Sequence, residues 1–135
     1  DHLLLHPVTG ISVTKTLGSY SSPSKYPWYA TASASLTPSN ATNQTVTWTT
    51  SSVSICGFAV QKKTTIGSTA ITYVEYTGSS YTGASCKFGC TNSHNTSGTA
   101  TITAKSADGI STSFKVRTFS YSDKDGDSDM GMEWY

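Results

Sequence analysis

The chain has 135 residues and a mass of 14.3 kDa, the size of one domain that can bury a substantial core. Charged residues make up only 13%, whereas Ser and Thr number 23 each and the formal net charge is +1. This composition excludes a coiled coil and a nucleic-acid-binding arm, and its aromatic and β-branched residues argue against wholesale disorder. No apolar run approaches the ~20 residues that a membrane span needs, so we expect no membrane insertion.

Charge is unevenly distributed along the chain. Residues 1–118 hold eight basic and three acidic residues, a net charge of +5, whereas residues 119–135 hold one basic and five acidic residues, a net charge of −4. Arg117 is the single arginine, and because specific base and phosphate contacts favour arginine, we expect no nucleic-acid partner. Residues 1–7 carry no initiator Met and no basic segment, so we interpret them as a linker or the end of a preceding segment, and not as a signal peptide. We expect the chain to be a mature product or a piece of a longer one.

Short runs that alternate between apolar and polar residues are separated by turn signals containing Gly or Pro, which is typical of an all-β fold. The clearest runs, in chain order, are residues 10–16, 28–36, 44–50, 97–106 and 110–119. Their apolar-in, Thr-out alternation predicts antiparallel strands with one wet face. Trp48 shares a strand face with Val46 and is predicted to be buried. The Asp108-Gly109 pair predicts a hairpin between the last two strands, with Gly109 at positive φ.

The middle of the chain is less regular. It predicts a strand at residues 54–61, a hairpin or long strand at 64–76, and a Gly-, Ser- and Cys-rich stretch at 78–95. The end, residues 120–135, shows no periodicity and is predicted to be an acidic tail.

Three segments together resemble the bacterial immunoglobulin-like domain, group 2 family. They are residues 8–13 (VTGISV), residues 36–52 (LTPSNATNQTVTWTTSS), and residues 97–109 (SGTATITAKSADG) with the strand that follows. The resemblance implies an immunoglobulin-like antiparallel β-sandwich over residues 8–119, with a long central insertion at about 56–95. Trp48 then corresponds to the Trp between the two sheets of such sandwiches.

The resemblance also implies a function outside the cell. We expect a non-catalytic module on a bacterial cell surface or phage virion that mediates adhesion or binds a glycan or another host-surface partner. The alternative is a structural or decorating domain of a phage capsid, tail or surface assembly, which binds neighbouring subunits. A third possibility is an accessory domain of an extracellular enzyme. The chain itself lacks Gly-x-Ser-x-Gly and His-Glu-x-x-His motifs, and we expect neither enzymatic activity nor a cofactor.

Aromatic residues crowd one predicted loop, residues 19–29, which contains Tyr20, Tyr26, Trp28 and Tyr29. Exposed rings beside hydroxyl groups can stack on sugars, so these four residues are the predicted ligand site. The alternative is that the rings close the end of the sandwich. A second aromatic group lies in the predicted insertion and consists of Tyr73, Tyr76 and Tyr81.

Two groups of residues could bind metal. Alternating carboxylates at Asp123, Asp125, Asp127 and Asp129 are a weak calcium candidate, since the glycine falls at the fourth and not the sixth position expected of an EF-hand loop. The alternative is a solvated acidic segment, and no metal is favoured. The three cysteines Cys56, Cys86 and Cys90 could join His94 in a zinc site, form one disulfide, or remain buried thiols.

Two bulky aromatic residues, Trp134 and Tyr135, end the acidic tail. Because aromatic residues dominate small interfaces, they are predicted to anchor the tail on a partner protein or a neighbouring copy. The tail itself is expected to be mobile until that partner or a calcium ion orders it.

Overall fold

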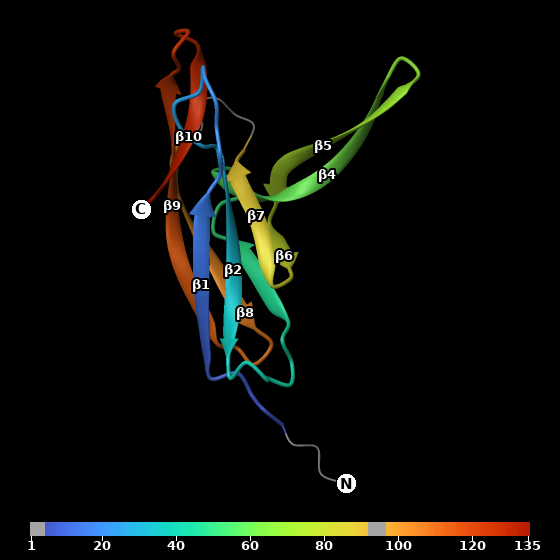
Figure 1. The fold of residues 1–135 in the computed structure, drawn as a ribbon, viewed down its shortest axis with the longest axis vertical. Helices are drawn as coiled ribbons and strands as arrows, with labels where there is room; N and C mark the ends of the chain where they lie inside the picture. Colours follow the sequence, from blue (N-terminus) through green and yellow to red (C-terminus); the bar gives the residue numbers. More distant parts are fainter. Residues whose placement is uncertain (1–4, 92–96) are drawn as a thin grey trace.

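The computed structural model describes residues 5–91 and 97–135 and shows an all-β chain (Figure 1). In this described part there is no helix, and so none that could cross a membrane. The strands in chain order are β1 (Gly10–Leu17), β2 (Tyr29–Thr37), β3 (Val46–Thr50), β4 (Cys56–Ile66), β5 (Thr69–Gly78), β6 (Ser80–Thr82), β7 (Ser85–Cys90), β8 (Gly98–Ser106), β9 (Ser111–Ser122) and β10 (Ser128–Trp134).

Two five-stranded antiparallel sheets pack face to face as a β-sandwich. The first sheet has the order β1-β2-β7-β4-β5, and the second has the order β10-β9-β8-β3-β6. This architecture confirms the all-β prediction and is consistent with an immunoglobulin-like sandwich. The alternation along β2, β3 and β8 places apolar residues between the sheets and mainly Thr or Ser on the outer faces.

Trp48 on β3 is the largest of the fully buried side chains. Its exposed fraction is 0%, and Val46 on the same strand lies in the same core cluster, as predicted. The indole Nε1–H donates a 2.8 Å hydrogen bond to the carbonyl of Gly83, in the turn between β6 and β7. Burying the ring therefore leaves no unpaired polar atom at this position.

The predicted hairpin between the strands on either side of Asp108-Gly109 forms as β8 and β9. Thr99 lies opposite Arg117 and Lys105 opposite Ser111, and the turn between the strands contains Gly109 at φ +88°. Positive φ is disfavoured for residues with a Cβ, which explains the glycine at this position.

The segment at 56–95 contributes to the sandwich itself. Strands β4 and β7 are inner strands of the first sheet, and Phe58 and Phe88 on them are buried in the core. Only the distal half of the β4–β5 hairpin leaves the body, where it forms a two-stranded projection that we call the arm, residues 61–74 (Figure 1). The arm reverses at Gly67, which has φ +64°.

The prediction of a separate acidic tail is wrong. Strand β9 continues to Ser122, the chain turns, and β10 runs back along β9 with the register Ser128–Ser122 to Trp134–Val116. Met130 and Met132 point into the core and are 5% and 1% exposed. The alternation of β10 is difficult to recognise in the sequence, because aspartates fill the turn before the strand and a glycine separates the two methionines.

The predicted partner anchors have different surroundings. Trp134 packs within its own sandwich, with its ring centroid 5.9 Å from that of Phe114 and 6.3 Å from that of Phe88. Trp134 is therefore part of a strand of its own sandwich, and its role as a partner anchor stays a prediction. Tyr135 is 72% exposed, and Lys115 lies over its ring at 5.7 Å.

Candidate functional site

The predicted aromatic loop connects β1 to β2 at one end of the sandwich, opposite the end that holds the β8–β9 turn (Figure 1). It lies against the loop between β9 and β10, because the amide of Lys124 donates a 3.0 Å hydrogen bond to the carbonyl of Pro23. The aromatic and acidic sequence features thus meet in one place. We call Tyr20, Tyr26, Trp28 and Tyr29 the aromatic patch.

Tyr26 is held at the surface by two rings from β9. Its centroid lies 4.9 Å from those of Phe119 and Tyr121, both in edge-to-face geometry. The hydroxyl of Tyr121 accepts hydrogen bonds from the backbone amides of Lys25 (2.9 Å) and Tyr26 (3.3 Å). These contacts fix the ring while 43% of the residue stays exposed. A ring supported on one side and open on the other is a suitable stacking platform.

Trp28 and Tyr29 form the second part of the patch. The predicted strand 28–36 included Trp28, but the observed β2 begins one residue later. Trp28 is 39% exposed, and its ring centroid lies 5.6 Å from that of Tyr29. Lys87 on β7 places its ammonium 4.5 Å from the Tyr29 centroid. Hydrogen bonds with the side chain and the backbone amide of Ser19 lower the pKa of the Tyr29 hydroxyl, and the positive charge of Lys87 adds to that effect.

Tyr20 is 50% exposed, so three of the four predicted rings have large open surfaces. The second aromatic group is not one cluster. Tyr76 is buried; an added Cβ at Gly89 on β7 would meet its ring, and one at Gly57 on β4 would collide with its backbone carbonyl. Tyr73 lies on the arm and Tyr81 on β6 in the other sheet, and both are exposed.

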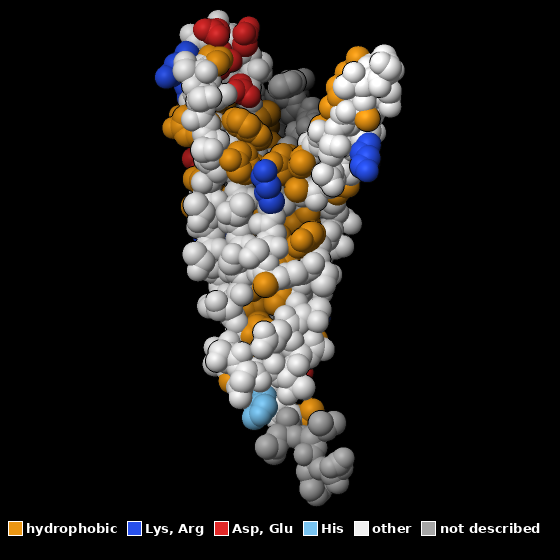
Figure 2. All heavy atoms as spheres, turned by 45° about the vertical axis from the view of Figure 1, so that its right-hand side comes forward, with side chains coloured by type: hydrophobic (Ala, Val, Ile, Leu, Met, Phe, Trp, Pro, Cys, Tyr) orange, Lys and Arg blue, Asp and Glu red, His pale blue; other side chains and the backbone are white. Residues whose placement is uncertain are grey.

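Polar groups surround the patch. The carboxylate of Asp129 accepts hydrogen bonds from the hydroxyls of Ser24 (2.9 Å) and Tyr121 (3.2 Å). Lys87 supplies an ammonium group from β7. Figure 2 shows apolar side chains gathered on the body, between the acidic side chains at its upper end and the arm. Open rings bordered by hydroxyls and charges can stack on a ligand and hydrogen-bond to its edge.

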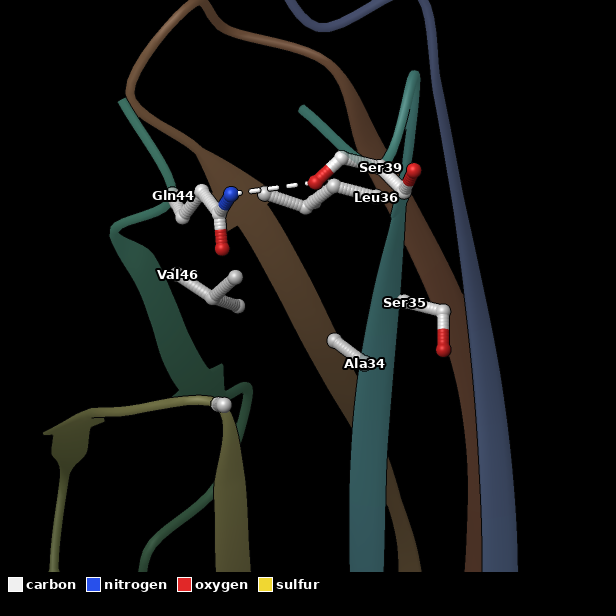
Figure 3. A pocket seen from close by; sticks show the side chains of 7 residues that line it. Ala34, Ser35, Leu36, Ser39, Gln44 and Val46 are labelled. Carbon is white, nitrogen blue, oxygen red and sulfur yellow. Dashed lines mark hydrogen bonds between the residues drawn. The ribbon is translucent and has the colours of Figure 1, made fainter. Parts of the chain in front are cut away.

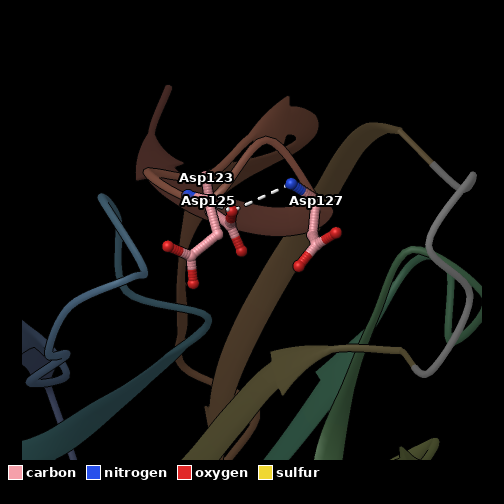
Figure 4. A group of neighbouring side chains, drawn as sticks. All are labelled: Asp123, Asp125 and Asp127. Atoms are coloured by element: carbon pink, nitrogen blue, oxygen red, sulfur yellow. Dashed lines mark hydrogen bonds between the residues drawn. The ribbon is translucent and has the colours of Figure 1, made fainter.

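Three of the four residues of the calcium candidate lie close together, and Asp129 is not part of that group. The carboxylates of Asp123, Asp125 and Asp127 each offer an oxygen within 4.8 Å of the others (Figure 4). Asp123 Oδ1 already accepts hydrogen bonds from the amides of Asp125 (2.9 Å) and Asp127 (3.0 Å), so the turn closes through its own contacts. Asp129 is engaged instead by Ser24, Tyr121 and the amide of Met130.

The zinc candidate cannot be assembled from the described residues, because His94 lies outside them. Cys56, Cys86 and Cys90 are all buried and free. Burial raises the pKa values of all three thiols, to about 12 for Cys86 and Cys90. Buried thiols of this kind are unreactive in the folded chain.

Two pockets lined by described residues lie away from the patch. One is a pocket of about 240 Å³ between the end of β2 and the start of β3, lined in part by Leu36, Gln44 and Val46 (Figure 3). The side-chain amide of Gln44 donates to the carbonyl of Ser39 at 3.1 Å across its mouth. A second, of about 220 Å³, lies beside His6 and Asp108. Neither pocket gathers exposed aromatic rings, so we place the candidate site at the aromatic patch.

Comparison with known proteins places no constraint on this site: no family model, no curated protein and no solved structure matches the chain.

Sequence reasoning missed the residues that support the patch from β9, Phe119 and Tyr121. It placed Phe119 at the end of a strand and Tyr121 in a tail. The signal was the run Thr118-Phe119-Ser120-Tyr121, which alternates as a strand does. Lys87 had no local signal, since only strand pairing brings β7 beside β2.

Proposed function

We propose that this chain is a non-catalytic immunoglobulin-like module, displayed on a bacterial cell surface or phage virion, that binds a surface glycan through the aromatic patch. The observation that carries the proposal is the pair of open rings at one end of the sandwich, Tyr26 and Trp28, each supported from behind by another aromatic ring. The family assignment and the surface location rest on the sequence resemblance alone.

A sugar fits this surface chemically. The C–H faces of pyranose rings pack on the negative face of an aromatic ring, and the sugar hydroxyls need donors and acceptors at the ring edge. Asp129 is an acceptor for such hydroxyls, and Lys87 is a donor. Rings that lie open at the surface, as Tyr26 and Trp28 do, favour an extended chain of sugars over a single buried monosaccharide.

The test is glycan-array binding of the 135-residue chain, followed by titration of the best glycan against variants. Trp28→Ala and the double variant Tyr20→Ala/Tyr26→Ala should each weaken binding about tenfold or more, since truncation of an aromatic anchor costs about 1.4 kcal/mol or more. Tyr81→Ala is the matched control, because it removes an equally exposed tyrosine from β6. Unchanged affinity in the patch variants, or an array with no binding, would contradict the proposal.

A second candidate function, a structural or decorating domain that binds neighbouring subunits, is favoured by the arm. Within the arm, residues 61–74, both strands are exposed, and Ile66, Ile71 and Val74 present apolar side chains to solvent. β5 is an edge strand whose arm portion carries no charged residue, whereas the facing part of β4 carries Lys62 and Lys63. Charged side chains protect an edge from pairing, so the unprotected edge of β5 is suited to accept a strand from a neighbouring copy.

A further inference from the structure

Two of the three cysteines lie directly opposite each other in neighbouring strands. In the pairing of β4 with β7, Cys56 is the register partner of Cys90, followed by Gly57 with Gly89 and Phe58 with Phe88. Residues opposite each other in an antiparallel pair place their side chains on the same face of the sheet. Both cysteines belong to the core cluster, 0% and 7% exposed, so this shared face is the inner one.

The hydrogen bonds identify the type of pair. The amide of Cys56 donates to the carbonyl of Ser52 (3.0 Å), and the amide of Cys90 donates to the carbonyl of Trp28 on the other side of β7 (2.9 Å). Neither amide is directed at the opposite cysteine. Cys56 and Cys90 therefore form a non-hydrogen-bonded pair, the closer of the two types, with Cα atoms about 4.5 Å apart. Disulfides bridge Cα separations of roughly 4.4–6.8 Å, so this separation suits the bond.

The third cysteine is out of reach. Cys86 lies on β7 four residues before Cys90, which corresponds to roughly 13 Å along an extended strand. Its register partner is Ala32 on β2, so no cysteine lies opposite it. The topology thus selects one of the three pairings that three cysteines allow.

We propose that Cys56 and Cys90 form a disulfide when the chain folds under oxidising conditions, and that Cys86 remains a thiol. That the chain can form this disulfide follows from the strand pairing. That the native protein contains it rests on the proposed extracellular location. The bond would fasten β4 to β7, which pair through only three register positions, at the root of the arm. In the structure all three thiols are free, and the Cys90 thiol donates a 3.6 Å contact to the carbonyl of Gly131, which the new bond would replace.

The chemistry is thiol–disulfide exchange with a small disulfide such as oxidised glutathione. One cysteine thiolate attacks the glutathione disulfide and releases one glutathione thiol, and the second cysteine thiolate then attacks the mixed disulfide and releases the other. Two S–H bonds of the protein are lost, one S–S bond forms, and the two electrons reduce the glutathione disulfide to two thiols. Because burial raises the thiol pKa values, the exchange takes place before the core closes.

The test is refolding of the reduced, denatured chain in a glutathione redox buffer, followed by alkylation in denaturant and peptide mapping by mass spectrometry. We expect one alkylated thiol per chain, at Cys86, and a single cross-linked peptide pair containing Cys56 and Cys90. Cys86→Ser should still lose the mass of two hydrogen atoms on oxidation. Cys56→Ser and Cys90→Ser should form no internal disulfide.

Three alkylated thiols in a refolded wild-type chain, or a bond that includes Cys86, would overturn the proposal. Folding is checked separately by circular dichroism of the reduced chain, and Cys90→Ala provides a second variant if the serine variants fail to fold. Because the readout is the pairing of sulfur atoms, it is independent of glycan binding and can fail or succeed without it.

Discussion

The carboxylate of Asp108 accepts a 2.8 Å hydrogen bond from the backbone amide of Val8, a residue 100 positions earlier in the chain. Asp108 lies in the β8–β9 turn, and Val8 is buried just before β1. The contact fastens the segment that enters the first sheet to a hairpin of the second. Asp108 therefore links the two sheets in addition to occupying the β8–β9 turn.

Replacing Asp108 by Ala should lower the free energy of unfolding by about 1–2 kcal/mol, because the buried amide of Val8 loses its partner. Asp108→Asn keeps an acceptor oxygen and should cost less. Urea denaturation of the two variants checks this. Equal stability of Asp108→Ala and the parent would mean that water replaces the carboxylate at no cost.

Trp48→Ala should lower the free energy of unfolding by about 3–5 kcal/mol, since it removes the largest fully buried side chain. Trp48→Phe retains most of the apolar surface but loses the hydrogen bond to Gly83, and should cost less. Thermal unfolding measures both changes. An alanine variant that melts within a few degrees of the parent would be incompatible with the described core.

Amides of β10 should be protected from hydrogen exchange in the isolated chain, and neither calcium nor a chelator should change that protection. The reason is that β10 is held by pairing with β9 and by Met130 and Met132 in the core. Arg117 and Glu133, opposite each other on the two strands, add an exposed ion pair. Exchange that slows only after calcium is added would restore the metal-ordered tail as the better description.

Val74→Lys should reduce self-association of the chain without changing its melting temperature. Val74 is 48% exposed on the arm, so the core is untouched, while a charge on β5 gives that edge the protection that lysines give β4. Sedimentation velocity over a range of concentrations measures the effect. Thr72→Val, an uncharged change on the same strand, is the control. A wild-type chain that stays monomeric throughout would count against the second candidate function.

Stability should be constant with pH on the alkaline side up to about pH 9 and decline above it. Burial raises the pKa of Cys86 and Cys90 from 9.0 to about 12, and that of Tyr76 from 10.0 to about 12. Because these folded-state pKa values exceed the unfolded ones, the unfolded chain loses protons first as pH rises, and folding weakens between about pH 9 and 12. Urea denaturation of the reduced chain across this range checks the decline, which should be smaller in Cys86→Ala.

The sequence by itself determined the all-β class, the buried position of Trp48 and the β8–β9 hairpin with Gly109. These features follow from local information: alternation with a period of two, a large aromatic residue on the inner face of a strand, and an Asp-Gly pair whose glycine can adopt positive φ in the turn. The exposed rings Tyr20, Tyr26 and Trp28 were also predictable, because loops rich in Ser and Pro leave aromatic side chains at the surface.

Only the tertiary structure decided how distant segments combine. The acidic end of the chain became β10 because its two methionines, separated by Gly131, fill space that β9 leaves open between the sheets. Tyr121 came to support Tyr26, and Cys56 came to face Cys90, through strand pairing across long sequence separations. Pairing of this kind depends on complementary buried faces and leaves little trace in either segment alone. The physical reason is that burial, which stabilises the pairing, is a property of both sheets together.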